Sequence, residues 1–140
     1  MRASSRKQSA GMIAVDTNIV VRYLTDDDRR QAAKARALIG ANDVFISRTV
    51  ILECEWVLRG VYGFSSREVR DALRAFAGLP KVSVEDLAVV VQAFDLVEKG
   101  VDFADALHLA GAEFCEAFAT FDQELIRRAK RAGLEKVRAP

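Results

Sequence analysis

Short apolar runs alternate with helix-forming segments along most of this 140-residue chain, and this alternation limits its possible folds more than any other feature. Short strands are expected at residues 12–16, 43–47, 81–84, 117–121 and 135–138. Strands that alternate with helices usually form a parallel sheet whose faces the helices cover. We therefore expect an α/β protein, a three-layer α/β/α sandwich with a central parallel sheet of four to five strands.

Helices are expected between these strands. Their predicted ranges are 17–24, 28–39, 49–60, 66–76, 85–99, 102–116 and 123–132. Gly40, Gly100 and Gly133 follow three of these segments, and glycine commonly ends a helix. Ser65 or Ser66 fits the cap of the fourth.

The overall charge does not point to a particular partner. The chain has 21 basic and 20 acidic residues and a net charge of +1, so contacts with a polyanion would have to come from local patches. Cys54 and Cys115 are far apart, and one histidine cannot complete a zinc site with them. We interpret them as reduced core thiols of a cytosolic protein. No apolar run approaches the length of a membrane span.

The first eleven residues, MRASSRKQSAG, are basic and polar. They lack the apolar region of a secretory signal, so we expect residues 1–11 to be a disordered leader. Met12 offers an alternative start of translation. Residues 12–140 are then expected to form a single domain, a length that suits one hydrophobic core.

Two aspartates directly follow expected strands. Asp16 ends the first strand, and Asp122 comes after the strand at residues 117–121. The carboxyl ends of parallel strands share one edge of the sheet, where ligands bind, so these two acids could converge. Each also fits a helix N-cap, which leaves both interpretations open. The polar neighbours that could orient such carboxylates are Thr17, Asn18 and Thr120.

The segment TVILECEWVL, residues 49–58, places two glutamates in an apolar helical run. Glu55 falls in the same sector as Arg48 and Arg59 and can pair with Arg59 four residues on, so we expect it on a solvated face. Glu53 falls on the other flank and has no basic neighbour on its helix. A partner from elsewhere in the fold is expected for it, such as a metal ion, an arginine or a buried donor.

The segment VDFADALHLAGAEF, residues 101–114, also mixes acids with an apolar face. Its expected core face consists of Phe103, Leu107, Ala110 and Phe114. The acids on the other side are Asp102, Asp105, Glu113 and Glu116, and helical periodicity does not choose a functional one among them. His108 fits a surface or packed histidine better than a ligand.

Four stretches in this order resemble the acidic motifs of the PIN domain family, and most closely those of the VapC toxins of bacterial toxin–antitoxin pairs. These stretches are AVDTNIVVRYL, ISRTVILECEWVL, DFADALHLA and ATFDQEL. The resemblance covers nearly everything from Met12 onward. It implies a parallel sheet between helices and a metal-dependent endoribonuclease that acts as the toxin of such a pair.

The resemblance also implies a set of site residues. The catalytic and metal-binding acids would be Asp16, Glu53, Asp105 and Asp122, with Asn18, Thr120 and Asp102 in support. Clustered carboxylates are hard oxygen ligands, which Mg²⁺ and Mn²⁺ prefer. One or two such ions can activate water for phosphodiester hydrolysis.

Partners follow from the same resemblance: an RNA substrate, a VapB-like antitoxin and a second copy in a homodimer, in the bacterial cytoplasm. Arg22 and Arg48 are candidates for holding RNA phosphates. Further candidates are Arg59 and the group Arg127, Arg128, Lys130 and Arg131, which equally fits the solvated face of a helix. The alternatives are a PIN-fold module that binds without cleaving and an aspartyl phosphatase. The second fits less well, because Asn18 stands where the common phosphatase motif has its second aspartate.

Overall fold

The computed structural model of the protein describes residues 11–140. The expected leader therefore lies, except for Gly11, outside the described residues. The helices are α1 (Thr17–Leu24), α2 (Arg29–Ala41), α3 (Arg48–Gly60), α4 (Ser66–Ala77), α5 (Leu87–Glu98), α6 (Phe103–Gly111) and α7 (Gln123–Arg131). The strands are β1 (Met12–Ala14), β2 (Asp43–Ile46), β3 (Val82–Val84), β4 (Phe118–Ala119) and β5 (Val137–Arg138). No helix in this part of the chain has the length and apolar character needed to cross a membrane.

The strands confirm the α/β class and the parallel arrangement, but they do not form one sheet. Strands β1, β2 and β3 lie side by side in that order, with Ile13 opposite Val44 and Val44 opposite Val82. Strands β4 and β5 pair separately, with Phe118 opposite Val137. The expected sheet of four to five strands is thus divided into sheets of three and two within residues 11–140. Each of the last two strands has only two residues, and their ladder bonds go to each other.

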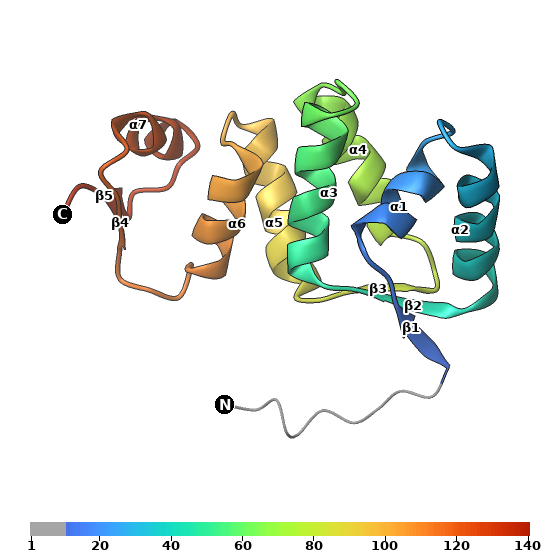
Figure 1. Cartoon of the computed structure of the whole chain (residues 1–140). Helices are drawn as coiled ribbons and strands as arrows, with labels where there is room; N and C mark the ends of the chain where they lie inside the picture. Colours follow the sequence, from blue (N-terminus) through green and yellow to red (C-terminus); the bar gives the residue numbers. More distant parts are fainter. Residues whose placement is uncertain (1–10) are drawn as a thin grey trace.

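Helices α1 to α6 form one packed group with the three-stranded sheet along one end of it, while α7 lies beyond α6 with β4 and β5 (Figure 1). Helix α3 packs against α1, α4 and α6, so it is covered on more than one side. Residues of the three-stranded sheet and of α1 to α6 supply most of the core, including Val20, Ile46, Ile51, Leu73 and Phe94.

Side-chain caps explain where several helices begin. Asp28 accepts a hydrogen bond from the Gln31 backbone N–H and so starts α2. Ser65 and Glu68 bond reciprocally to each other's backbone N–H in a capping box at the start of α4. These caps fix the entry of the chain into α2, which packs on α1, and into α4, which packs on α3.

Helix α6 is shorter than predicted. It ends at Gly111 instead of near residue 116, and Phe114, expected in the core, is 89% exposed. The core face of α6 is formed by Phe103, Ala106, Leu109 and Ala110. Because the chain turns after Gly111, Phe114 no longer follows the helical face that the spacing predicted.

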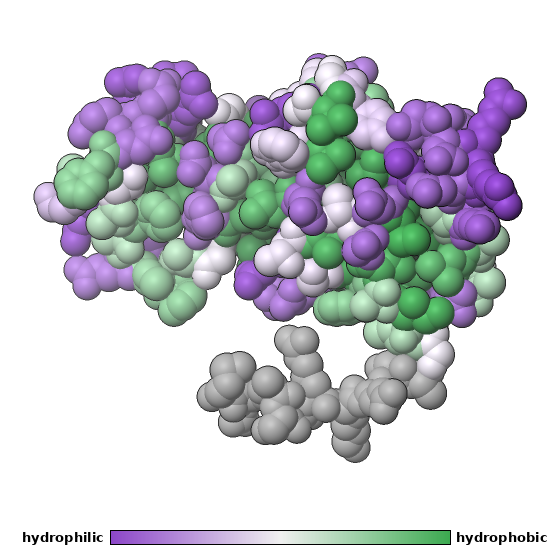
Figure 2. All heavy atoms as spheres, in the orientation of Figure 1, coloured by the Kyte–Doolittle hydropathy of each residue, from purple (hydrophilic) through white to green (hydrophobic). Residues whose placement is uncertain are grey.

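Hydrophilic residues gather over α7 in Figure 2. The basic side chains of Arg127, Arg128, Lys130 and Arg131 are all exposed there, while Leu125 and Ala129 form the buried face. The basic group therefore lies on the solvated face of an amphipathic helix.

Candidate functional site

Asp16 lies between the first strand and α1. Its carboxylate Oδ1 accepts a hydrogen bond of 3.2 Å from the Ile19 backbone N–H, and the side chain remains exposed. The N-cap interpretation of Asp16 is therefore confirmed, and it leaves the carboxylate at the surface. Asn18, the second residue of the same helix, is also exposed.

Glu53 receives its partner from α1. The hydroxyl of Thr17, which is only 9% exposed, donates a hydrogen bond to Glu53 Oε1 and ties α3 to the start of α1. Burial raises the pKa of the neighbouring Cys54 thiol to about 12, and the negative charges of Glu53 and Asp16 add to the shift. Both carboxylates thus lie near the same buried thiol, and we call Asp16, Thr17 and Glu53 the α1–α3 group.

Three aspartates form a second set, which we call the α6–α7 group: Asp102, Asp105 and Asp122. Asp105 is half-buried, and its pKa is raised by desolvation first and then by the charges of Asp102 and Asp122. Asp122 begins α7, where its Oδ1 accepts from the Leu125 backbone N–H at 3.1 Å. Thr120 orients this turn, because its hydroxyl accepts from the Asp122 backbone N–H at 3.0 Å.

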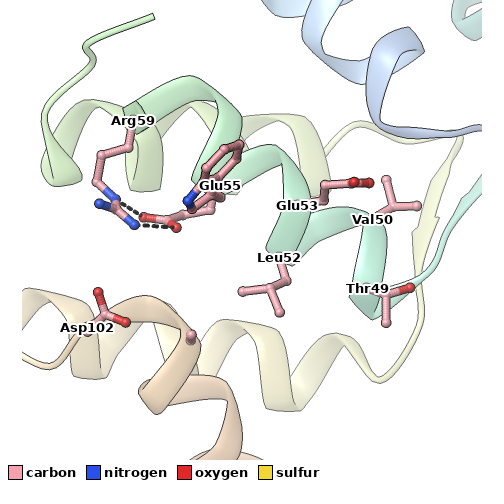
Figure 3. A pocket seen from close by; sticks show the side chains of 9 residues that line it. Thr49, Val50, Leu52, Glu53, Glu55, Arg59 and Asp102 are labelled. Carbon is pink, nitrogen blue, oxygen red and sulfur yellow. Dashed lines mark hydrogen bonds and ion pairs between the residues drawn. The ribbon is translucent and has the colours of Figure 1, made fainter. Parts of the chain in front are cut away.

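A pocket of about 690 Å³ between α3 and α6 connects the two groups. Glu53 of the α1–α3 group and Asp102 of the α6–α7 group both line it. Figure 3 shows Asp102 on α6 across from Arg59 and Glu55, with Glu53 further along α3. Acids of both groups therefore face one cavity from two helices.

Glu55 does not lie on a solvated face, so that expectation is wrong. Its side chain is only 7% exposed and accepts two hydrogen bonds from Arg59, at 2.8 and 3.4 Å. The predicted pairing with Arg59 is confirmed. The burial arises because α6 covers this side of α3, with Asp102 lining the same pocket. The hydrogen bonds that Arg59 donates to Glu55, together with the negative charge of Glu55, raise the pKa of the Arg59 guanidinium.

The two arginines expected to hold RNA already have partners within the protein. Arg22 donates to Gln31, Asp27 and the Tyr62 hydroxyl. Arg48 lies 3.3 Å from a carboxylate oxygen of Asp86. Their contact with RNA stays a prediction, and it would require these bonds to be shared or exchanged.

The four expected catalytic acids do not converge on one point. Their carboxylate oxygens are the ligand type that Mg²⁺ and Mn²⁺ prefer, so the donor chemistry fits such an ion. Among residues 11–140, however, no group of three or more potential ligands is close enough to hold a metal ion. The acids instead stand as the α1–α3 group and the α6–α7 group, on two sides of the pocket.

Sequence reasoning did not assign a site role to Trp56, although it named Arg59, which lines the same pocket, as a candidate for holding RNA phosphates. Trp56 is 59% exposed, and together with Arg59 it lines the pocket one turn from Glu53. Spacing along α3 places both residues correctly on the helix. The sequence does not reveal that the start of α6 lies opposite this side of α3, so that the two helices line one pocket.

Comparison with known protein families identifies the class. The PIN domain model matches residues 13–131, and the chain therefore belongs to the PIN domain family. Among solved structures, it is similar to the Mycobacterium tuberculosis toxin VapC20, described as a Sarcin-Ricin loop cleaving toxin. The identity is 23%, the match covers 82% of this chain and 93% of that chain, and the TM-score is 0.42. No curated protein matches the chain.

Proposed function

We propose that this PIN domain is a metal-dependent endoribonuclease that acts as the toxin of a toxin–antitoxin pair. The main observation in support is the pocket between α3 and α6, which Glu53 and Asp102 line from opposite helices. The negative charges of Asp102 and Asp122 both act on Asp105. Asp16 and Glu53 both lie near the Cys54 thiol. Of the four motif acids, Glu53 lines this cavity itself, and Asp105 lies near Asp102 on the opposite wall.

The chain's own residues would hold the acids ready. Thr17 fixes Glu53 through its hydroxyl, and Thr120 fixes the turn that presents Asp122. The pKa of Asp105 is raised first by desolvation and then by the negative charges of Asp102 and Asp122, and a bound cation would offset these charges. When bound, Mg²⁺ or Mn²⁺ would supply an activated water and stabilise charge on the phosphate.

Cleavage of unpaired RNA by the purified protein tests this proposal. We expect internal cuts in the presence of Mg²⁺ or Mn²⁺, and loss of cutting when EDTA is added. Mapping of the new RNA ends distinguishes internal cleavage from trimming. Full activity in EDTA would contradict the metal dependence.

Two glutamate variants test whether activity depends on the Glu53 carboxylate in particular or only on the loss of one negative charge. Glu53→Gln should abolish cleavage, because it removes the motif carboxylate that lines the pocket. Glu98→Gln is the matched control, since Glu98 is an exposed glutamate at the end of α5. Equal activity of both variants would reject Glu53 as a catalytic residue.

One observation favours a second candidate, a PIN-fold module that binds RNA without cleaving it. Among residues 11–140, no group of three or more potential ligands is close enough to hold a metal ion by itself. This candidate predicts saturable RNA binding that is independent of Mg²⁺ and no new RNA ends after long incubation. The cleavage assay with and without metal therefore decides between the two functions.

The proposed biological setting includes a VapB-like antitoxin, a homodimer and the bacterial cytoplasm. An arginine of the antitoxin could pair with the acids of the pocket, because a guanidinium binds carboxylates in two-point geometry. Co-expression with the product of a neighbouring small gene should relieve growth inhibition and block cleavage. An antitoxin complex that still cuts RNA would contradict the blocking role.

A further inference from the structure

Trp56 is exposed to an unusual degree for its size. Its side chain is 59% exposed on α3, although indole rings normally bury most of their apolar surface. The ring lies over Gly60, where an added Cβ would stand 3.8 Å from Trp56 Cε2. One part of the indole therefore rests against the bare helix surface of Gly60, and much of the remainder faces solvent.

The ring lies next to the proposed catalytic glutamate. Glu53 and Trp56 are three residues apart on α3, which places their side chains as neighbours about 5–6 Å apart at Cβ. Both line the same pocket of about 690 Å³. A nucleotide whose phosphate is held near Glu53 through a divalent cation would therefore bring its base to the indole.

Polar groups border the ring on the same wall. Glu55 and Arg59 form their ion pair beside it, and the Arg59 side chain is 40% exposed. Across the pocket, Asp102 makes no capping hydrogen bond to α6. This mixture of one flat apolar surface with nearby donors and acceptors suits a nucleobase, which has a π face and a hydrogen-bonding edge. Val50, Leu52 and Ala104 also line the pocket, so its apolar wall extends beyond the indole and can cover the rest of a stacked base.

We propose that Trp56 is a stacking platform that positions one unpaired base of the RNA substrate beside Glu53. The proposal rests on the proposed ribonuclease function and assigns a positioning residue to it. Stacking of a base on an aromatic side chain tolerates different sequences, so Trp56 would favour single-stranded over paired RNA.

Trp56 is the single tryptophan of the chain, so its fluorescence reports on the ring directly. The experiment uses the Glu53→Gln protein, because this substitution is expected to prevent cleavage. A short unpaired RNA oligonucleotide is titrated into it in the presence of Mg²⁺. We expect saturable quenching of the emission. An oligonucleotide of the same length without bases should bind more weakly and leave the emission nearly unchanged.

Variants measure the contribution to binding. With a labelled RNA followed by anisotropy in the Glu53→Gln background, Trp56→Ala should weaken binding by about 5- to 100-fold, since a stacked base contributes about 1–3 kcal/mol. Trp56→Phe should retain most of the affinity, because it keeps an aromatic face. In the active protein, Trp56→Ala should raise KM more than it lowers kcat. Urea unfolding of each variant verifies that substitution at the exposed residue 56 leaves the free energy of unfolding unchanged.

The outcomes separate this proposal from the ribonuclease proposal. Quenching without any cleavage by the wild-type protein would retain the stacking role and reject catalysis. If the wild-type protein cleaves RNA but the tryptophan emission is not quenched, and if Trp56→Ala leaves KM unchanged, the stacking proposal is rejected while the ribonuclease proposal stands. If added RNA leaves the tryptophan emission unchanged but a higher protein concentration shifts it, the ring contacts a second copy of the chain. That result would overturn the proposal.

Discussion

The Glu55–Arg59 pair should respond unequally to loss of its two members. Glu55 is 7% exposed at its side chain, whereas Arg59 is 40% exposed. Arg59→Met leaves a buried carboxylate without its partner, and Glu55→Met leaves a guanidinium that water can still reach. Methionine is the replacement in both cases, because it is unbranched and favours helices.

The expected magnitudes follow from this asymmetry. Removing one partner of a fully buried pair costs about 3–5 kcal/mol, and we expect about 2–3 kcal/mol for Arg59→Met because the pair is partly solvated. Glu55→Met should cost less than about 1 kcal/mol. The double variant, with apolar groups at both positions, should be more stable than Arg59→Met alone, because the buried charge is gone.

Urea unfolding at neutral pH in EDTA measures all four proteins. The matched control is the exposed pair Glu124–Arg128 on α7, where the side chains are 47% and 44% exposed. Arg128→Met should cost about 0.5 kcal/mol or less. If the double variant is no more stable than Arg59→Met, then Glu55 is not buried as described, and the reasoning is refuted.

Three further predictions concern single side chains. The pKa of Asp105 is raised in the folded protein, so its ionisation destabilises the fold: metal-free stability should fall as pH rises from about 4. Asp105→Asn should therefore melt higher than the wild type near neutral pH in EDTA, and an equal or lower melting temperature would contradict the raised pKa. With a pKa of about 12, the buried Cys54 thiol should not react with a disulfide reagent in the native protein, while the half-buried Cys115 reacts. Native Cys115→Ser protein that still reacts would show that Cys54 is accessible. Ser65→Ala removes the capping box of α4 and should cost about 1 kcal/mol in urea unfolding, with no loss if the cap is dispensable.

Local sequence signals predicted the first part of the fold well. Helix α1 spans the expected residues 17–24, and Asp28 and Ser65 occupy helix starts that capping preferences indicate. These features depend on a few neighbouring residues, so one sequence is sufficient to predict them. The grouping of strands is different, because pairing of β4 with β5 instead of β1 is decided by contacts distant in sequence.

The candidate site shows the same division. The positions of Asp16 and Asp122 after strands were predictable, and both are helix caps as the alternative interpretation allowed. The burial of Glu55 was not predictable, since a helical wheel gives the residues of a sector but not the element that covers it. The contact of Thr17 with Glu53 likewise joins residues 36 positions apart.

The separate β4–α7–β5 unit has a consequence for local unfolding. Its buried side chains are few and mostly small: Leu125, Ala129, Ala132 and Val137. Such a unit opens at a lower free energy than the rest of the molecule. Amide hydrogen exchange should therefore be faster in α7 than in the central strand β2, whose two edges are both paired. Because Asp122 belongs to this unit, the coupling between Asp122 and Asp105 would be lost during each opening, long before the whole domain unfolds.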